Sequence, residues 1–207
     1  MTESFDHVNA KIFAVGAKDV NLARLVPVFH RWIQDSMCEE LLIDVADYRH
    51  VPSGPGVILV GHEANYSLDN GRNRLGLLYN RKAVLPRHAK DKIVQAFRAA
   101  LLACRRLEEE PELSGDLKFD AGEAEIVIND RLLAPNTDEA FENLRPDLMA
   151  ALEEVYGSND VRVERRGQPR ERLRIGVDAR QRVHDKPVGQ IPKTIPAGED
   201  WPDDRVE

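Results

Sequence analysis

The dipeptide Asn70-Gly71 constrains the fold more than any other feature, because it separates two segments in which polar and apolar residues alternate. A type I′ turn needs two successive residues that tolerate positive φ angles, and Asn-Gly supplies both. We therefore expect residues 57–82 to fold back on themselves as a β-hairpin. A two-residue turn at this position would place His62 opposite Tyr79.

Alternation along the predicted hairpin sorts its side chains between the two faces of a sheet. One face would carry His62 and Tyr79 among apolar neighbours, and the other would carry Glu63, Arg72 and Arg74. His62 and Glu63 would then leave the strand in opposite directions. The pair could not chelate one metal ion unless a β-bulge intervened.

Helical and strand periodicities predict the remaining elements. Apolar residues recur at steps of three and four, which is the helix spacing, in segments 19–37, 87–109 and 138–156. Short apolar or alternating runs predict strands at 11–15, 41–45, 125–129, 161–164 and 173–177. Pro27 lies inside the first helical segment, where we expect a kink or a break.

The second half of the chain repeats the order of elements in the first half. A shift of 119 positions aligns the apolar residues of the first and third helical segments and carries Pro27 onto Pro146. A proline inside a helix costs about 3 kcal/mol, so its recurrence favours an internal duplication of a βαββ unit. The alternative is that any two amphipathic helices of similar length can be aligned in this way.

These elements predict an α+β fold made of two βαββ, ferredoxin-like halves related by a pseudo-twofold axis. A β-hairpin and a long helix join the halves, and helices cover one face of a largely antiparallel sheet. A single mixed sheet is the alternative. The predicted segments are an N-terminal arm at 1–9, a first βαββ unit with the added hairpin at 10–82, a connecting helix and acidic loop at 83–121, a second βαββ unit at 122–178 and an extended proline-rich arm at 179–207.

The composition is that of an ordinary globular protein, with 42% hydrophobic and 31% charged residues. The longest apolar runs, such as Val57–Val60, are too short to span a bilayer. The first residues lack the basic-then-apolar pattern of a secretory signal. The two cysteines, Cys38 and Cys104, suit buried thiols better than a disulfide framework. The sequence therefore predicts a cytoplasmic protein without a membrane partner.

Charge is distributed unevenly along the chain, although the net charge is only −7. Segment 72–98 has eight basic residues and one acidic residue, a net +7, and segment 162–186 has nine and four, a net +5. The span 99–161 has five basic and sixteen acidic residues, a net −11. Basic segments can bind phosphates or an acidic partner. We favour the simpler explanation, in which they pair with the acidic middle of the same chain.

The C-terminal segment changes character, with prolines at 187, 192, 196 and 202 and little periodicity. This composition is typical of an extended or disordered arm. Its apolar residues are the predicted anchors on the fold or on a protein partner, namely Val188, Ile191, Ile195 and Trp201.

No established catalytic signature occurs in the sequence, whether a phosphate loop, a dinucleotide turn, a nucleophile elbow, a CxxC pair or a zinc-protease helix. His50, His62 and Tyr79 are the candidate catalytic residues, because imidazole can act as a general base. Asp44, Asp47 and His50 form a candidate metal site. The simpler explanation is that Asp47 caps a turn and that His62 is a hydrogen-bonded core histidine.

The hairpin also offers a candidate set of ligand-binding residues, namely Glu63, Tyr66, Arg72, Arg74 and Arg81. An arginine guanidinium can bind a carboxylate or phosphate through two hydrogen bonds. The simpler alternative is a solvated sheet surface stabilised by cross-strand pairs. No cofactor can be named from these residues.

Three functions remain open at this point. The first is a non-enzymatic interaction or assembly module, which would bind a protein partner or itself through its sheet surface and C-terminal arm. The second is a small enzyme or ligand-binding protein, with a pocket between the halves for a small anionic or metal-bound ligand. The third is a nucleic-acid-associated protein that uses the basic segments 72–98 and 162–186. We favour the first, because the catalytic signatures are missing.

Overall fold

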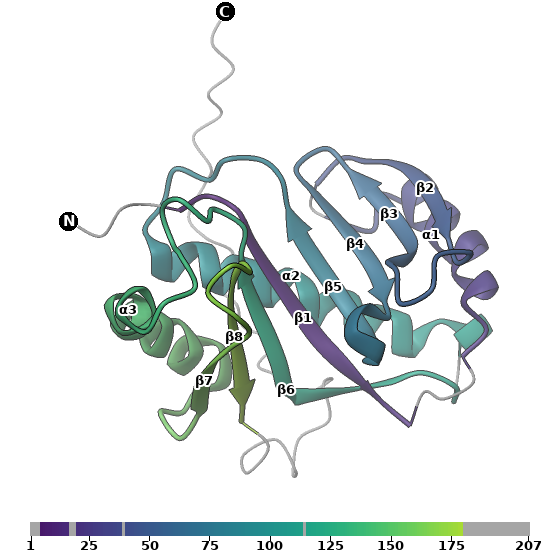
Figure 1. Ribbon diagram of the computed structural model, residues 1–207. Coiled ribbons are helices and arrows are strands. Elements are labelled where there is room, and N and C mark those ends of the chain that lie inside the picture. The colour runs from purple at the N-terminus through teal and green to yellow at the C-terminus, as the bar shows by residue number, and fades with distance from the viewer. Residues whose placement is uncertain (1–4, 17–19, 39, 114, 180–207) are drawn as a thin grey trace, which may run out of the picture.

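The computed structural model describes residues 5–16, 20–38, 40–113 and 115–179, and these form one eight-stranded sheet with three α-helices (Figure 1). The strands are β1 (Val8–Val15), β2 (Leu42–Tyr48), β3 (Gly56–Gly61), β4 (Ala64–Asp69), β5 (Gly76–Arg81), β6 (Lys118–Ile128), β7 (Arg162–Arg166) and β8 (Leu173–Asp178). The helices are α1 (Leu25–Gln34), α2 (Ala89–Glu109) and α3 (Asp138–Tyr156). All neighbouring strands of this sheet are antiparallel, so the predicted α+β fold with an antiparallel sheet is confirmed.

The strand order is β2-β3-β4-β5-β1-β6-β8-β7. Strands β1 to β5 come from the first half of the chain and strands β6 to β8 from the second half. The β1–β6 pair joins the two sets, with Ala10 opposite Ile126. Strands from both predicted βαββ units therefore belong to one continuous sheet, and the internal duplication stays a prediction.

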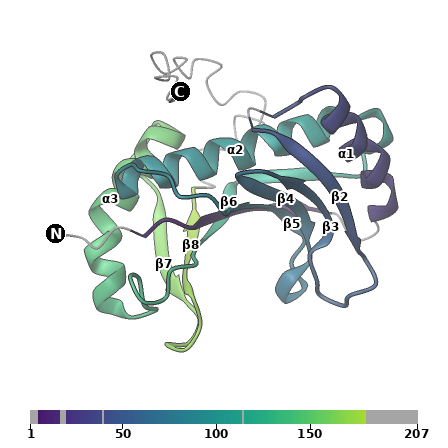
Figure 2. The ribbon, with the colours of Figure 1, turned by 90° about the horizontal axis from the view of Figure 1, so that it is seen from above.

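All three helices lie on the same side of the sheet (Figure 2). The face beneath them carries the alternate residues Ile12, Leu77 and Tyr79, which are fully buried. Helix α2 crosses this face and buries Ile93 and Phe97 against it. Each such side chain contributes roughly 1.5–3 kcal/mol when it leaves water, so the packing of this layer holds the helices on the sheet.

Helices α1 and α3 extend the same core to either side of α2. Helix α3 packs along α2, where the rings of Phe97 and Tyr156 lie 6.2 Å apart, and Tyr156 donates a hydrogen bond of 2.9 Å to the Ala121 carbonyl. Burial raises the pKa of the Tyr156 hydroxyl, which keeps it a donor. Helix α1 is tied to the end of α2 because Trp32 Nε1 donates to the Glu110 carboxylate at 2.5 Å.

The two prolines that match in sequence occupy different places in their helices. Pro27 lies in the first turn of α1, where a helix leaves backbone N–H groups unpaired. The expected break falls earlier in the chain, at a 3-10 turn over Leu22–Arg24. Pro146 lies in the middle of α3. The recurrence of proline therefore does not reflect a shared kink.

The predicted hairpin exists, but its register is wrong by four residues. Tyr79 pairs with Tyr66, and the connection between β4 and β5 runs from residue 70 to residue 75. The positive φ angles fall on Arg72 and Asn73, at 60° and 57°, and Asn70 has a φ of −104°. A loop four residues longer than a type I′ turn shifts the pairing by four and leaves the inward-facing residues of both strands unchanged.

A second turn lies where the sequence suggested a continuous strand. The chain turns at His62 and Glu63, which separates β3 from β4. Val60 therefore pairs with Asn65 and lies on the face opposite to Tyr66, contrary to the expected alternation. His62 is not opposite Tyr79.

In the segments that the structure describes, no helix is long and apolar enough to cross a membrane. The predicted anchors of the C-terminal arm, Val188, Ile191, Ile195 and Trp201, lie outside the described residues.

We expect Pro146→Ala to raise the free energy of unfolding by about 1–3 kcal/mol, because it removes a ring from the interior of α3 and restores a helical N–H. The matched variant Pro27→Ala should change it by less than ~1 kcal/mol, because the first turn of α1 tolerates proline. Urea unfolding followed by circular dichroism measures both. Equal effects for the two variants would contradict the different placement of the prolines.

Candidate functional site

The face of the sheet opposite to the helices carries no helix within the described chain, and we call it the helix-free face. Cross-strand pairs place two rows of side chains on it. The first row runs Val60, Asn65, Asn80, Asn9, Val127 and Arg174, and the second runs Ile58, Ser67, Leu78, Lys11, Glu125 and Gly176. Within these two rows the residues of β3 to β5 are uncharged, and the charged residues come from β1, β6 and β8. One further outward residue of β4, Asp69, is charged and pairs with Lys11.

The charged half of the helix-free face is a layer of buried ion pairs. Lys11 is only 4% exposed, and its Nζ lies 2.5 Å from the Asp69 carboxylate. Burial lowers the pKa of Lys11, although Asp69 and Glu125 oppose this shift. Beside it, Arg174 pairs with Glu125, and both side chains are largely buried. We call these four residues the buried charge layer.

Two arginines of the β4–β5 loop form contacts beside this layer. Arg74 lies 3.7 Å above the Phe13 ring and pairs with Glu123 at 2.9 Å. Arg72 pairs at 2.7 Å with Glu171 in the loop between β7 and β8. Because β1 and β6 lie between β5 and β8 in the sheet, the Arg72–Glu171 pair links two loops across the middle of the face.

The uncharged half of the face differs from the charged half in composition and in the loop side chains beside it. We define the neutral patch as six outward residues of β3, β4 and β5, namely Ile58, Val60, Asn65, Ser67, Leu78 and Asn80, and it excludes Asp69 at the end of β4, which pairs with Lys11. Five of these side chains are half-buried, and Ser67 is buried. The patch therefore presents apolar and amide groups without any formal charge.

Asn65 contributes an unsatisfied acceptor to the neutral patch. It lies beside Asn80, which in turn lies beside Asn9 on β1. Asn9 accepts a hydrogen bond of 2.9 Å from Asn129. In contrast, the side-chain oxygen of Asn65 is buried and accepts no hydrogen bond from the described residues. A buried acceptor without a donor costs about 1–3 kcal/mol.

The helical side of β4 and β5 holds a second polar group, centred on two tyrosines. The rings of Tyr66 and Tyr79 meet edge to face at 5.2 Å. The Tyr79 hydroxyl accepts a hydrogen bond of 2.9 Å from Gln95 on α2 and a longer one from Arg81. Arg81 also pairs with Glu63 at 3.0 Å. Burial raises the pKa of the Tyr79 hydroxyl, so it remains protonated.

Glu40 extends this tyrosine cluster to the α1–β2 loop. Its carboxylate accepts a hydrogen bond of 2.7 Å from the Ala64 backbone N–H and another from Tyr66. Burial raises the pKa of Glu40 above that of an exposed glutamate. Burial also raises the pKa of the neighbouring Cys38 thiol, which disfavours the thiolate that a nucleophilic cysteine needs.

The structure brings some of the predicted site residues together and separates others. A series of contacts joins four of them: Tyr66 packs on Tyr79, Tyr79 is hydrogen-bonded to Arg81, and Arg81 pairs with Glu63. His62 is exposed at the turn after β3, whereas His50 is exposed in the loop before β3, so the two histidines lie at opposite ends of that strand. The candidate catalytic set His50, His62 and Tyr79 therefore does not assemble.

The predicted metal ligands do not form a cluster either. Asp44 and Asp47 are three positions apart on β2 and point to opposite faces. The Asp47 carboxylate binds Arg49 at 2.6 Å, and that hydrogen bonding lowers the pKa of Asp47 to about 2. The His50 ring stacks on Tyr48. Among the described residues, no group of three or more His, Cys, Asp or Glu side chains could hold a metal ion.

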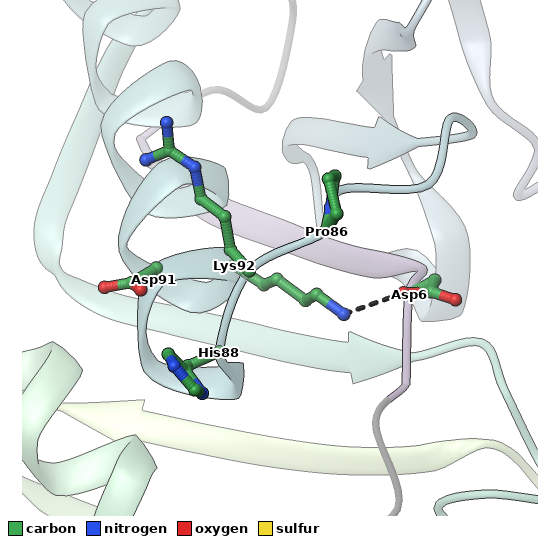
Figure 3. A pocket seen from close by; sticks show the side chains of 6 residues that line it. Asp6, Pro86, His88, Asp91 and Lys92 are labelled. Carbon is green, nitrogen blue, oxygen red and sulfur yellow. Dashed lines mark hydrogen bonds and ion pairs between the residues drawn. The ribbon is translucent and has the colours of Figure 1, made fainter.

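An open pocket of about 500 Å³ lies at the first turn of α2 (Figure 3). It is lined by Asp6, Pro86, Arg87, His88, Asp91 and Lys92. Lys92 is buried, and its Nζ donates to the Phe5 carbonyl at 2.6 Å and to the Asp6 carboxylate at 2.7 Å. These bonds connect α2 to the segment that precedes β1. The polar groups in the pocket therefore have a structural role.

No protein-family model matches the chain, and no curated protein sequence is significantly similar to it.

We expect Lys11→Met to lower the free energy of unfolding by about 3 kcal/mol or more, because it leaves the largely buried Asp69 carboxylate without its cation. The matched variant Arg72→Ala removes an ion pair whose side chains are 49% and 41% exposed, so it should cost less than ~1 kcal/mol. Urea unfolding at neutral pH measures both. A larger loss for Arg72→Ala would contradict the burial of the charge layer.

The variant Glu40→Gln tests the raised pKa of the Glu40 carboxyl group, which belongs to the tyrosine cluster. A carboxyl group whose pKa is raised on folding stabilises the protein fully below its unfolded value, about 4.3, and this stabilisation is lost as pH rises through the folded pKa. Glutamine keeps an acceptor for Ala64 and cannot ionise. We therefore expect the stability of the variant relative to the native protein to increase between pH 4 and pH 7, as measured by urea unfolding. A relative stability that does not change, or that falls, would contradict this.

Proposed function

We propose that this protein is a non-enzymatic interaction module, and that a protein partner docks on the neutral patch of its helix-free face. The observation that supports this most directly is the contrast between the two halves of that face. Arginines of the β4–β5 loop form ion pairs on the charged half, and the six residues of the neutral patch carry no charge.

The chemistry of the patch supports docking of a protein surface. The centres of protein–protein interfaces are depleted in charged residues and rich in apolar contacts. Ile58 and Val60 on β3 and Leu78 on β5 supply half-buried apolar surface on the two strands that flank β4. A donor on the partner would satisfy the side-chain oxygen of Asn65 after a small rotation of its amide.

The pairing of the basic segments favours this proposal over nucleic-acid binding. In segment 72–98, six of the eight basic side chains form ion pairs within the chain, namely Arg72, Arg74, Arg81, Lys90, Lys92 and Arg98. Their partners include Glu123 and Glu154 from the acidic middle of the sequence. A phosphate backbone would have to displace these carboxylates to be bound.

The strand order supports the further proposal of an internal duplication. Without the β4–β5 hairpin, the order outward from the centre is β1, β3, β2 on one side and β6, β8, β7 on the other. Helix α1 follows β1 and helix α3 follows β6, and these are the two strands at the centre of the sheet. A twofold axis between β1 and β6 would relate the two sets, and the hairpin that carries most of the neutral patch would be an insertion in the first copy.

We expect Leu78→Glu to abolish the capture of a partner by the immobilised full-length protein, because it places a charge among the uncharged side chains of the neutral patch. The matched control is Leu102→Glu, which makes the same change at an exposed leucine on α2. Captured proteins are identified by mass spectrometry, and circular dichroism checks that both variants fold.

The proposal requires a partner that native protein and the Leu102→Glu variant retain and that the Leu78→Glu variant loses. The same partner should protect the amides of β3 to β5 from hydrogen exchange. Identical capture by all three proteins, or protection confined to the pocket beside α2, would overturn it.

A further inference from the structure

The two edges of the sheet are protected to different degrees. An unpaired edge strand can bind another chain, and proteins commonly prevent this with charged side chains or short strands. Strand β7 is short and has charged residues at four of its five positions, namely Arg162, Glu164, Arg165 and Arg166. Strand β2, at the opposite edge, is longer and has two charged residues, Asp44 and Asp47.

Exposed apolar side chains gather along the β2 edge. Four of the nine large apolar side chains that are exposed in the described chain lie between positions 41 and 51, namely Leu41, Ile43, Tyr48 and Val51. Ile43 is 52% exposed at a β-bulge, where the register with β3 shifts. From Asp44 onward the pairing with β3 is regular, so Asp44–Tyr48 has the geometry to accept a further strand.

We propose that the β2 edge pairs with the β2 edge of a second copy of this chain, antiparallel about a twofold axis at Ala46. We choose a second copy as the partner because, in this arrangement, the side chains of β2 are complementary to those of another β2. Such an axis places Asp44 beside Tyr48 of the second copy, and Tyr48 beside its Asp44, on the helix-free face. Ala46 would lie opposite its own counterpart, where a small side chain allows close approach.

The Asp44 carboxylate and the Tyr48 hydroxyl, which this axis brings together, have no side-chain hydrogen-bond partner within the described chain, although the Tyr48 ring stacks on His50. Asp44 accepts a hydrogen bond from the backbone N–H of Val45 and forms no ion pair with the described residues. The Tyr48 hydroxyl has no hydrogen bond within the described chain, and the residue is 43% exposed. On the other face the axis places Val45 beside Asp47 of the second copy, and Arg49 already neutralises Asp47.

This pairing would join two sheets into one, because an isologous contact of an edge strand with itself closes after two copies. The helix-free faces of both copies would then be continuous across β2. The inference does not depend on partner binding at the neutral patch, which lies on β3 to β5.

Sedimentation equilibrium of the full-length protein tests the proposal. Native protein at about 100 μM should have twice the chain mass of 23.4 kDa. Ala46→Arg should have the single mass, because two bulky cations would meet at the axis. The matched variant Leu132→Arg, at a side chain that is 95% exposed in the loop after β6, should keep the double mass.

Cysteine cross-linking supplies a positive test that does not depend on loss of a signal. In a Cys38→Ser background, Ala46→Cys should form a covalent dimer under mild oxidation, because residues opposite each other on antiparallel strands approach within disulfide range. Leu132→Cys is the control for random collision. A native protein of single mass, an Ala46→Arg variant of double mass, or equal cross-linking of the two cysteine variants would overturn the proposal.

Discussion

The pairing of β1 with β6 is the contact on which the rest of the structure depends. It is the junction between strands from the two halves of the sequence, and both faces of the sheet use it. On the helical side it sets Ala10 against Ile126 beneath the helices, and on the other side it sets Lys11 against Glu125. A change in this register by one residue would exchange the apolar core for the buried charge layer.

The two faces solve the same problem with different chemistry. Helices exclude water from one face through apolar side chains such as Phe97, and half of the other face carries buried ion pairs, with loop arginines beside them. Arg74 lies over the Phe13 ring and pairs with Glu123. The neutral patch on the other half of that face is uncharged and mostly half-buried, and for this reason we propose that a partner docks there.

The sequence was sufficient to predict what local periodicity determines. The three helices, the hairpin and the charge pairing between segments all follow from patterns within the chain. The register was wrong because nothing in the sequence indicates that Arg72 and Asn73, instead of Asn70 and Gly71, adopt positive φ angles. Glu40 and Gln95 were missed because their contacts with Tyr66 and Tyr79 join segments that only the folded chain brings together.

The Arg72–Glu171 link has a consequence for how the protein responds to its solution. Both side chains are partly in water, so dissolved ions weaken their attraction, whereas the pairs beneath them are shielded. Raising ionic strength would therefore release the two loops from each other before it disturbed the sheet. The helix-free face would then become more accessible to water as the salt concentration rises.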